Sequence, residues 1–152
     1  MDLQELFPKE AKVAIGGKEY SLRFSPRGLR YLEQQYKDKE LPGITEGQKP
    51  VKMKDAIAII VYFLAKAQFG LTIDEVYHLL FAGLAHTKAF PDFDDFLDVL
   101  DEHHTREYAN QITIALALAY YTPEQIKKVE VMAERAKADD SSKNAGEPAT
   151  RQ

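Results

Sequence analysis

Ten consecutive apolar or aromatic residues stand between Ala56 and Ala65, and this run limits the folds that the chain can adopt. A membrane-spanning helix needs roughly 20 such residues, so the run predicts a buried element of a globular fold. Its length, its alanines and Gly70 just beyond it favour a helix over residues 53–69, although its β-branched residues leave a strand open. Because the run is apolar on nearly every face, we expect it at the centre of the fold. The expected core comprises Ile57, Ile60, Leu64, Leu80, Ile112 and Leu116.

A β-hairpin is predicted before this run. Residues 12–24 alternate apolar and polar side chains on both sides of a Gly-Gly pair, which is the pattern of two strands joined by a tight turn. Between the hairpin and the apolar run, the prolines and glycines of Lys37 to Lys52 predict a mobile loop.

Capping signals mark the starts of further helices. Ser25 followed by proline predicts a helix over residues 26–36. Thr72 and Glu75 have the spacing of a reciprocal capping box, which predicts a helix over residues 73–86. Apolar residues at helical spacing predict three more helices, over residues 92–102, 106–121 and 123–138.

These elements predict a mainly α (α+β) fold, in which an N-terminal β-hairpin packs on a bundle of five to six helices. A chain of 152 residues is long enough for one hydrophobic core. We therefore expect a single globular domain over residues 1–138. The polar sequence from Asp139 onward predicts a disordered tail over residues 139–152.

Composition and charge limit the classes of function that the protein can have. Cysteine is absent, which excludes disulfides and thiolate chemistry and favours a reducing compartment. The first residues lack the basic start and apolar stretch of a secretory signal, so we expect a cytoplasmic protein. Residues 1–54 hold 11 basic and 8 acidic side chains, whereas residues 55–152 hold 9 and 16. This asymmetry fits either head-to-tail self-association or an ordinary scatter of surface charge.

Metal and catalytic chemistry find little support in the sequence. His103 and His104 stand among acidic residues, but the cluster lacks a His-Glu-x-x-His motif and a fourth ligand with suitable spacing. The aspartates near Asp94 are not a calcium loop, since Leu97 stands where such a loop needs glycine or oxygen ligands. No carboxylate lies in an apolar run that would shift its pKa toward acid–base catalysis. We therefore expect no catalytic residues, no metal, no cofactor and no enzyme activity.

Aromatic and acidic residues are the candidates for protein binding. Phe90 and Phe93 stand in and beside a loop, and Tyr120 and Tyr121 stand at a helix end, where aromatic rings commonly anchor interfaces. Burial in the core is the alternative for Phe93 and Phe96, because their spacing fits one apolar stripe. The candidate residues of the acidic face are Asp94 and Asp95.

A basic patch is predicted on the hairpin and the first helix. It comprises Arg23, Arg27 and Arg30 with Lys18, and Tyr20 and Tyr31 stand beside it. Cations next to aromatic rings fit a single-stranded nucleic acid. A net charge of −4 and a pI near 5.6 argue against that partner, since nucleic-acid binders of this size usually carry a basic excess.

Three segments of the chain resemble the tail assembly chaperones of long-tailed, siphovirus-type bacteriophages. The first is the hairpin from Val13 to Phe24 with the Leu29–Glu33 helix after it. The second is the central apolar helix. The third is the Ala82–His86 segment with its acidic, aromatic sequel from Phe90 to Asp101. The likeness covers most of residues 12–121, and the long loop of residues 37–52 departs from the family pattern.

The resemblance implies a small helical protein that binds the tape measure protein, keeps it soluble and recruits tail tube subunits during tail morphogenesis. Such a chaperone acts in the host cytoplasm, lacks catalytic residues and is absent from the mature virion. We expect homo-oligomers whose head-to-tail contacts join the face of residues 92–102 to the basic face of Arg23, Arg27 and Arg30. The alternative function is a small nucleic-acid-associated regulatory or packaging factor that uses the basic hairpin and helix.

Overall fold

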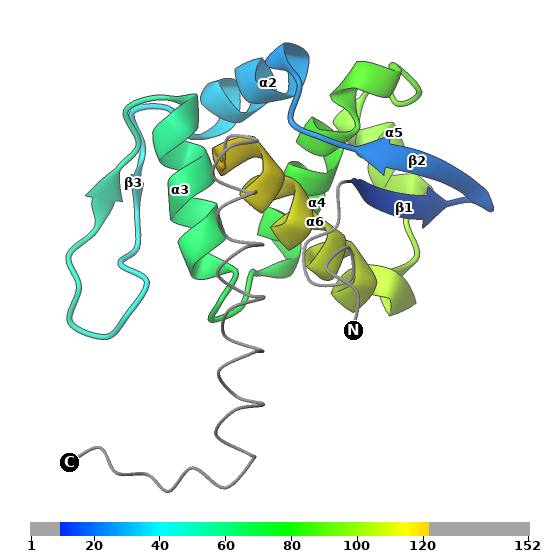
Figure 1. Ribbon diagram of the computed structural model, residues 1–152. Coiled ribbons are helices and arrows are strands. Elements are labelled where there is room, and N and C mark those ends of the chain that lie inside the picture. The colour runs from blue at the N-terminus through cyan, green and yellow to red at the C-terminus, as the bar shows by residue number, and fades with distance from the viewer. Residues whose placement is uncertain (1–9, 122–152) are drawn as a thin grey trace, which may run out of the picture. The chain divides into compact units, whose positions relative to one another are not determined.

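The computed structural model describes residues 10–121, of which Glu10–Tyr120 form one compact unit (Figure 1). A two-stranded hairpin and five α-helices make up most of this unit, which confirms the expected α+β class. The predicted helix over residues 123–138 and the predicted tail over residues 139–152 lie outside the described residues. In chain order the elements are β1 (Ala11–Ile15), β2 (Lys18–Leu22), α2 (Pro26–Tyr36), β3 (Glu40–Leu41), β4 (Val51–Lys52), α3 (Ala56–Lys66), α4 (Ile73–Gly83), η1 (Ala85–Thr87), α5 (Phe93–Asp98), η2 (Glu102–His104) and α6 (Thr105–Tyr120).

The hairpin forms where the sequence predicts it. Strands β1 and β2 pair antiparallel, with Ala11 opposite Leu22 and Ile15 opposite Lys18. Gly16 and Gly17 have φ values of 61° and 83°, the left-handed conformation that a two-residue hairpin turn requires. The alternate residues of β1 are buried, because the hairpin lays its apolar face on α6.

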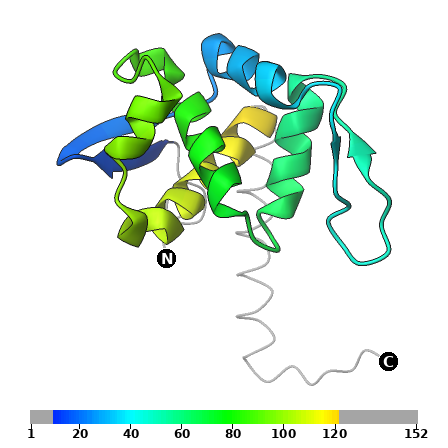
Figure 2. The same cartoon turned by 180° about the vertical axis from the view of Figure 1, so that it is seen from behind.

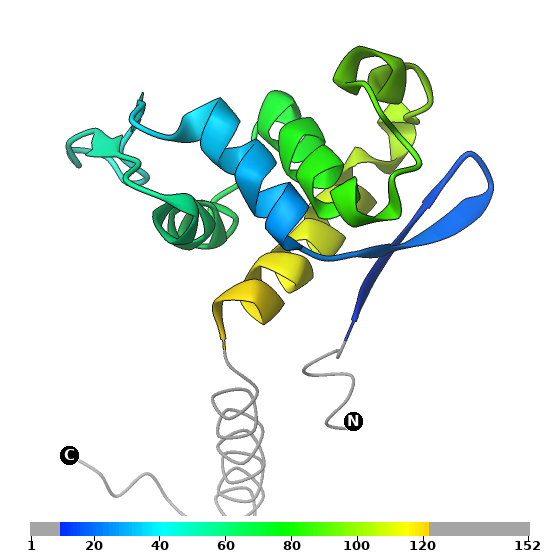
Figure 3. The ribbon, with the colours of Figure 1, turned by 90° about the horizontal axis from the view of Figure 1, so that it is seen from above.

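Helix α2 packs on α4 at a point where both backbones come close, and Figure 3 shows the two helices side by side. The Ser25 hydroxyl accepts a hydrogen bond from the Gly28 amide, so the predicted N-cap is confirmed. A Cβ on Gly28 would lie 2.3 Å from the Ala82 carbonyl oxygen. Gly28 is therefore not only a weak helix former, as its propensity indicates, but the residue that lets α2 approach α4.

Helix α6 occupies the position that the sequence analysis assigned to α3. It contacts α3, α4, β1 and β2, and it buries Tyr108, Ile112, Ala115 and Leu116. The prediction that the apolar run is central is wrong. Helix α3 lies on the outer side of α6 and buries one face only (Figure 2). Ile57 was expected in the core but is exposed, and Leu64 is half-buried, whereas Ile60 and Leu80 are in the core as expected.

The segment of residues 37–52 was expected to be a loop, and the structure differs at its two ends, where two short strands form. Strands β3 and β4 pair antiparallel through Glu40 with Lys52 and Leu41 with Val51. The ladder continues past the strands, since the amide of Asp38 donates to the carbonyl of Met53. The Tyr62 hydroxyl of α3 donates to the Pro42 carbonyl, which ties the small hairpin to the helix.

Several helix ends differ from the predicted ones. The capping box at Thr72 and Glu75 is confirmed, but α4 ends at Gly83 and a short 3₁₀ turn, η1, follows it. Helix α5 has six residues rather than the eleven predicted. Helix α6 begins at Thr105, one residue before the predicted start, and the Thr105 hydroxyl donates to the Glu102 carbonyl.

Candidate protein-interaction surfaces

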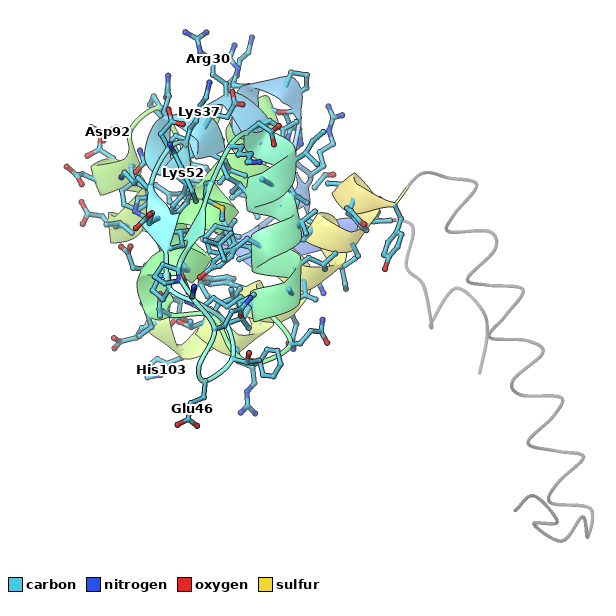
Figure 4. All side chains as sticks on the ribbon, turned by 90° about the vertical axis from the view of Figure 1, so that its left-hand side faces the viewer. Arg30, Lys37, Glu46, Lys52, Asp92 and His103 are labelled. Atoms are coloured by element: carbon cyan, nitrogen blue, oxygen red, sulfur yellow. The ribbon has the colours of Figure 1, made fainter. Side chains whose placement is uncertain are left out.

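A groove of about 710 Å³ lies between α2 and the chain that continues from α4 through η1 to Pro91. We call it the basic groove, because three cations and no carboxylates are among its lining residues. The lining residues are Pro26, Arg27, Arg30, Tyr31, Gln34, Phe81, Ala85, Lys88, Phe90 and Pro91. Figure 4 shows Arg30 pointing outward from the ribbon.

The cations of the basic groove have no acidic partner in the part of the chain that the structure describes. None of Arg27, Arg30 and Lys88 has a carboxylate oxygen within 4.0 Å there. Lys88 has a φ of 59°, a left-handed backbone conformation that residues other than glycine and asparagine rarely adopt. Hydrogen bonds of Thr87 to the Leu84 carbonyl and the Ala89 amide hold this turn in place. The groove therefore presents exposed positive charge on a fixed backbone.

Aromatic rings form the apolar wall of the groove. The Phe81 ring packs against Tyr31 at 4.9 Å between centroids and against Phe96 at 5.3 Å. Phe90 lies 4.9 Å from Phe96 and 5.3 Å from Tyr20, so it joins α5 to the hairpin. Phe96 is fully buried and Phe93 is half-buried, which favours the core alternative for these two rings. Phe90 remains a candidate for binding, because it lines the groove.

His78 contacts Tyr31, a residue of the groove wall, and holds it in place. Its Nδ1 lies 2.8 Å from the Tyr31 hydroxyl, and its ring stacks on Phe93 at 4.3 Å with an angle of 1°. Its Nε2 lies 3.5 Å from an Asp74 carboxylate oxygen. These contacts fit a neutral imidazole that carries its proton on Nε2 and accepts the Tyr31 hydroxyl proton at Nδ1. Burial lowers the pKa of His78, and it outweighs the opposing charge of Asp74, which faces solvent.

The Asp74–His78–Tyr31 chain resembles a catalytic relay, but its electrostatics point to a structural role. Burial and the negative charge of Asp74 raise the pKa of Tyr31 to about 12. A phenol with a raised pKa stays protonated at neutral pH, so it is a poor nucleophile and a poor base. The hydrogen bond to His78 instead holds the Tyr31 ring in the groove wall.

An acidic segment begins where the groove ends. Pro91 lines the groove, and the next residue, Asp92, caps α5 by accepting a hydrogen bond from the Asp94 amide. Asp94, Asp95 and Asp98 are exposed on the outer side of α5. Arg27 and Arg30 stand in the first half of the sequence and the aspartates of α5 in the second, and the fold places the two surfaces next to each other.

Six predicted residues do not line the groove: Phe93, Asp94 and Asp95 belong to α5, and the other three are Arg23, Tyr120 and Tyr121. Arg23 donates its amide to the Gly83 carbonyl, and its positive charge adds to burial in lowering the pKa of His86. Tyr120 is the last residue of α6, and neither tyrosine lines the groove. The structure thus brings together Arg27, Arg30 and Phe90 of the predicted site residues.

A second surface was not predicted at all. Four large apolar side chains are exposed on α3, on the turn after it and at the start of α4: Ile57 by 70%, Val61 by 41%, Phe69 by 69% and Ile73 by 62%. We call them the α3 stripe. Ile57, Val61 and the exposed Ala65 follow one another at four-residue spacing on α3, and Phe69 lies in the turn after the helix. The Lys66–Glu75 ion pair joins the end of α3 to the start of α4, so the stripe is part of a fixed surface.

Neither a clustered metal site nor a membrane-spanning helix is found among residues 10–121. No group of three or more histidine, cysteine, aspartate or glutamate side chains there is placed to hold a metal ion. Within the same residues, no helix is both long and apolar enough to cross a membrane.

Comparison of the chain with protein-family models, with curated proteins and with solved structures finds no significant match. The likeness to tail assembly chaperones therefore depends on the residues quoted above, and its functional content is a proposal.

Proposed function

We propose that this protein is a tail assembly chaperone of a long-tailed bacteriophage. In this role it binds the tape measure protein in the host cytoplasm, keeps it soluble, recruits tail tube subunits and leaves before the virion is complete. The observation that carries the proposal is the α3 stripe. Ile57 and Val61 stand four residues apart on α3, and with Phe69 and Ile73 after the helix they form an exposed apolar surface that fits the apolar face of a partner helix.

The size of the α3 stripe fits weak and repeated binding. Full burial of one large aliphatic or aromatic side chain contributes roughly 1.5 to 3 kcal/mol, and each of these side chains is already partly buried. Four such contributions amount to about 5 kcal/mol, which is close to the lower end of the cost of association. One copy would therefore bind weakly and reversibly. Many copies along an elongated helical partner would cover it while leaving each copy easy to displace.

Co-expression with the tape measure protein encoded in the same phage genome tests the proposal. The variant I57E/V61E places two charges in the stripe, and I57L/V61I is the matched control that keeps the same positions apolar. We expect the soluble yield of the tape measure protein to fall several-fold with the charged variant and to stay unchanged with the control. Both positions are exposed, so neither variant should lower thermal stability much. Equal yields with the two variants would contradict the proposed role of the stripe.

The alternative, a nucleic-acid-associated regulatory or packaging factor, is favoured by one observation. The basic groove places Arg27, Arg30 and Lys88 beside three aromatic rings, the chemistry of a single-strand binding site. Titration of the protein with a single-stranded oligonucleotide at 50 and 200 mM salt tests it. Binding that weakens steeply with salt and is lost in R27Q/R30Q would support this second function.

A further inference from the structure

We propose that the basic groove is a docking site for a second copy of this chain, and that its occupant is the acidic helix α5. Because groove and α5 are neighbours on one molecule, the contact closes as a two-fold symmetric dimer. This inference does not depend on the chaperone function.

Charge complementarity identifies the occupant. Arg27, Arg30 and Lys88 have no carboxylate partner within 4.0 Å in residues 10–121. Helix α5 carries Asp94, Asp95 and Asp98 in a single short stretch, all of them exposed. Among these aspartates, too, the structure of residues 10–121 shows no ion pair to a lysine or arginine. Opposite charges on two exposed surfaces steer the encounter of two copies and fix their register.

Apolar side chains on α5 match the wall of the groove. Leu97 is exposed on α5, and Val99 is exposed directly after it. The groove wall opposite them would be the rings of Tyr31, Phe81 and Phe90. A short segment that carries both carboxylates and exposed aliphatic side chains therefore matches both the cations and the rings of the groove.

The same neighbourhood disfavours a nucleic acid as the occupant. Asp92 follows the groove residue Pro91, and Asp94 and Asp95 continue along α5. A polyanion leaving the groove on this side would meet these aspartates and be repelled. A protein segment whose negative charge is confined to a few residues avoids this repulsion.

The adjacency of the two surfaces decides the symmetry. A head-to-tail chain needs the two complementary surfaces on different sides of the molecule, so that each copy leaves one of them free for the next. When the surfaces lie side by side, a two-fold axis between them places each groove on the partner's α5, and both contacts form at once. The proposed assembly is therefore a closed dimer and not the head-to-tail oligomer that the sequence predicted.

Sedimentation velocity of the full chain at 50 and 500 mM salt tests the proposal. We expect a dimer that weakens at high salt. R27E/R30E and D94K/D95K should each weaken the dimer at least about tenfold, because every contact then joins like charges. An equimolar mixture of the two variants should restore it, since one contact of the mixed dimer pairs glutamate with lysine and the other pairs arginine with aspartate. The control E40K/E46K makes the same change of net charge as D94K/D95K but on the β3–β4 hairpin, and Figure 4 shows Glu46 far from Arg30.

The outcomes separate the possibilities. A wild-type dimer that each variant weakens and the mixture restores would support the proposal. A monomer at every concentration and salt would overturn it. Species larger than a dimer that grow with concentration would overturn the two-fold closure in favour of a head-to-tail chain. An R27E/R30E variant that still dimerises but loses binding to a single-stranded oligonucleotide would assign the groove to nucleic acid and overturn it as well.

Discussion

Truncation of two isoleucines of α3 that stand three residues apart should change the stability by very different amounts. Ile60 is 3% exposed and belongs to the core, whereas Ile57 is 70% exposed in the α3 stripe. Truncating a buried isoleucine to alanine typically costs about 2 to 5 kcal/mol of unfolding free energy, from lost burial and from the cavity that remains. The same change at Ile57 removes little buried surface, and the higher helix propensity of alanine offsets part of that loss. We therefore expect I60A to lose roughly 2 kcal/mol or more and I57A to stay within about 0.5 kcal/mol of wild type.

Urea unfolding followed by far-UV circular dichroism measures both changes. With a typical slope of about 1 to 3 kcal/mol per molar urea, the I60A midpoint should fall by roughly 1 M or more, and the I57A midpoint should barely move. A loss of more than about 1 kcal/mol in I57A would show that the α3 stripe is covered, and it would refute the exposed surface on which the proposed function depends. A loss below about 0.5 kcal/mol in I60A would instead refute the assignment of the core face of α3.

Two further predictions concern the packing of α2 and α4. G28A should destabilise the protein by about 1 to 3 kcal/mol despite the better helix propensity of alanine, because its Cβ would meet the Ala82 carbonyl oxygen at 2.3 Å; an increase in the urea midpoint would contradict the close approach of the helices. Stability should also fall as the pH drops below about 6.5, since burial lowers the pKa of His78 and the unfolded chain then binds the proton more readily. Urea midpoints at pH 7.5 and 5.0 should differ less in H78F, which keeps a ring to stack on Phe93 but cannot titrate, and an unchanged difference would exclude His78 as the cause.

Local signals in the sequence predicted the local structure. The Gly-Gly turn, the Ser25 N-cap and the Thr72–Glu75 capping box each depend on residues within a few positions of one another. Such patterns determine their own backbone geometry, so the elements formed where expected. The strands β3 and β4 were missed because two residues each are too few to show alternation, and their pairing depends on contacts with α3.

Burial and neighbourhood were harder to predict, because they depend on the arrangement of whole helices. An all-apolar helix was expected to be central, but α6 took that place and left one face of α3 exposed. Arg27, Arg30 and Phe90 were named from the sequence, whereas Lys88 joined them only through the left-handed turn after η1. His78 had no signal of its own, since its role comes from its contacts with Tyr31 and Phe93.

The two surfaces are separate, and this separation links the proposals. The basic groove is lined from α2, the end of α4 and residues 85–91, whereas the α3 stripe comes from α3 and the start of α4, so they share no residue. A dimer closed through the grooves would therefore keep both α3 stripes available. Two stripes on one dimer would bind an elongated helical partner with a second contact that is intramolecular, which raises the overall affinity without any new kind of contact. Weak single contacts would then suffice to cover the partner, and R27E/R30E should reduce binding to the tape measure protein even though it leaves the α3 stripe intact.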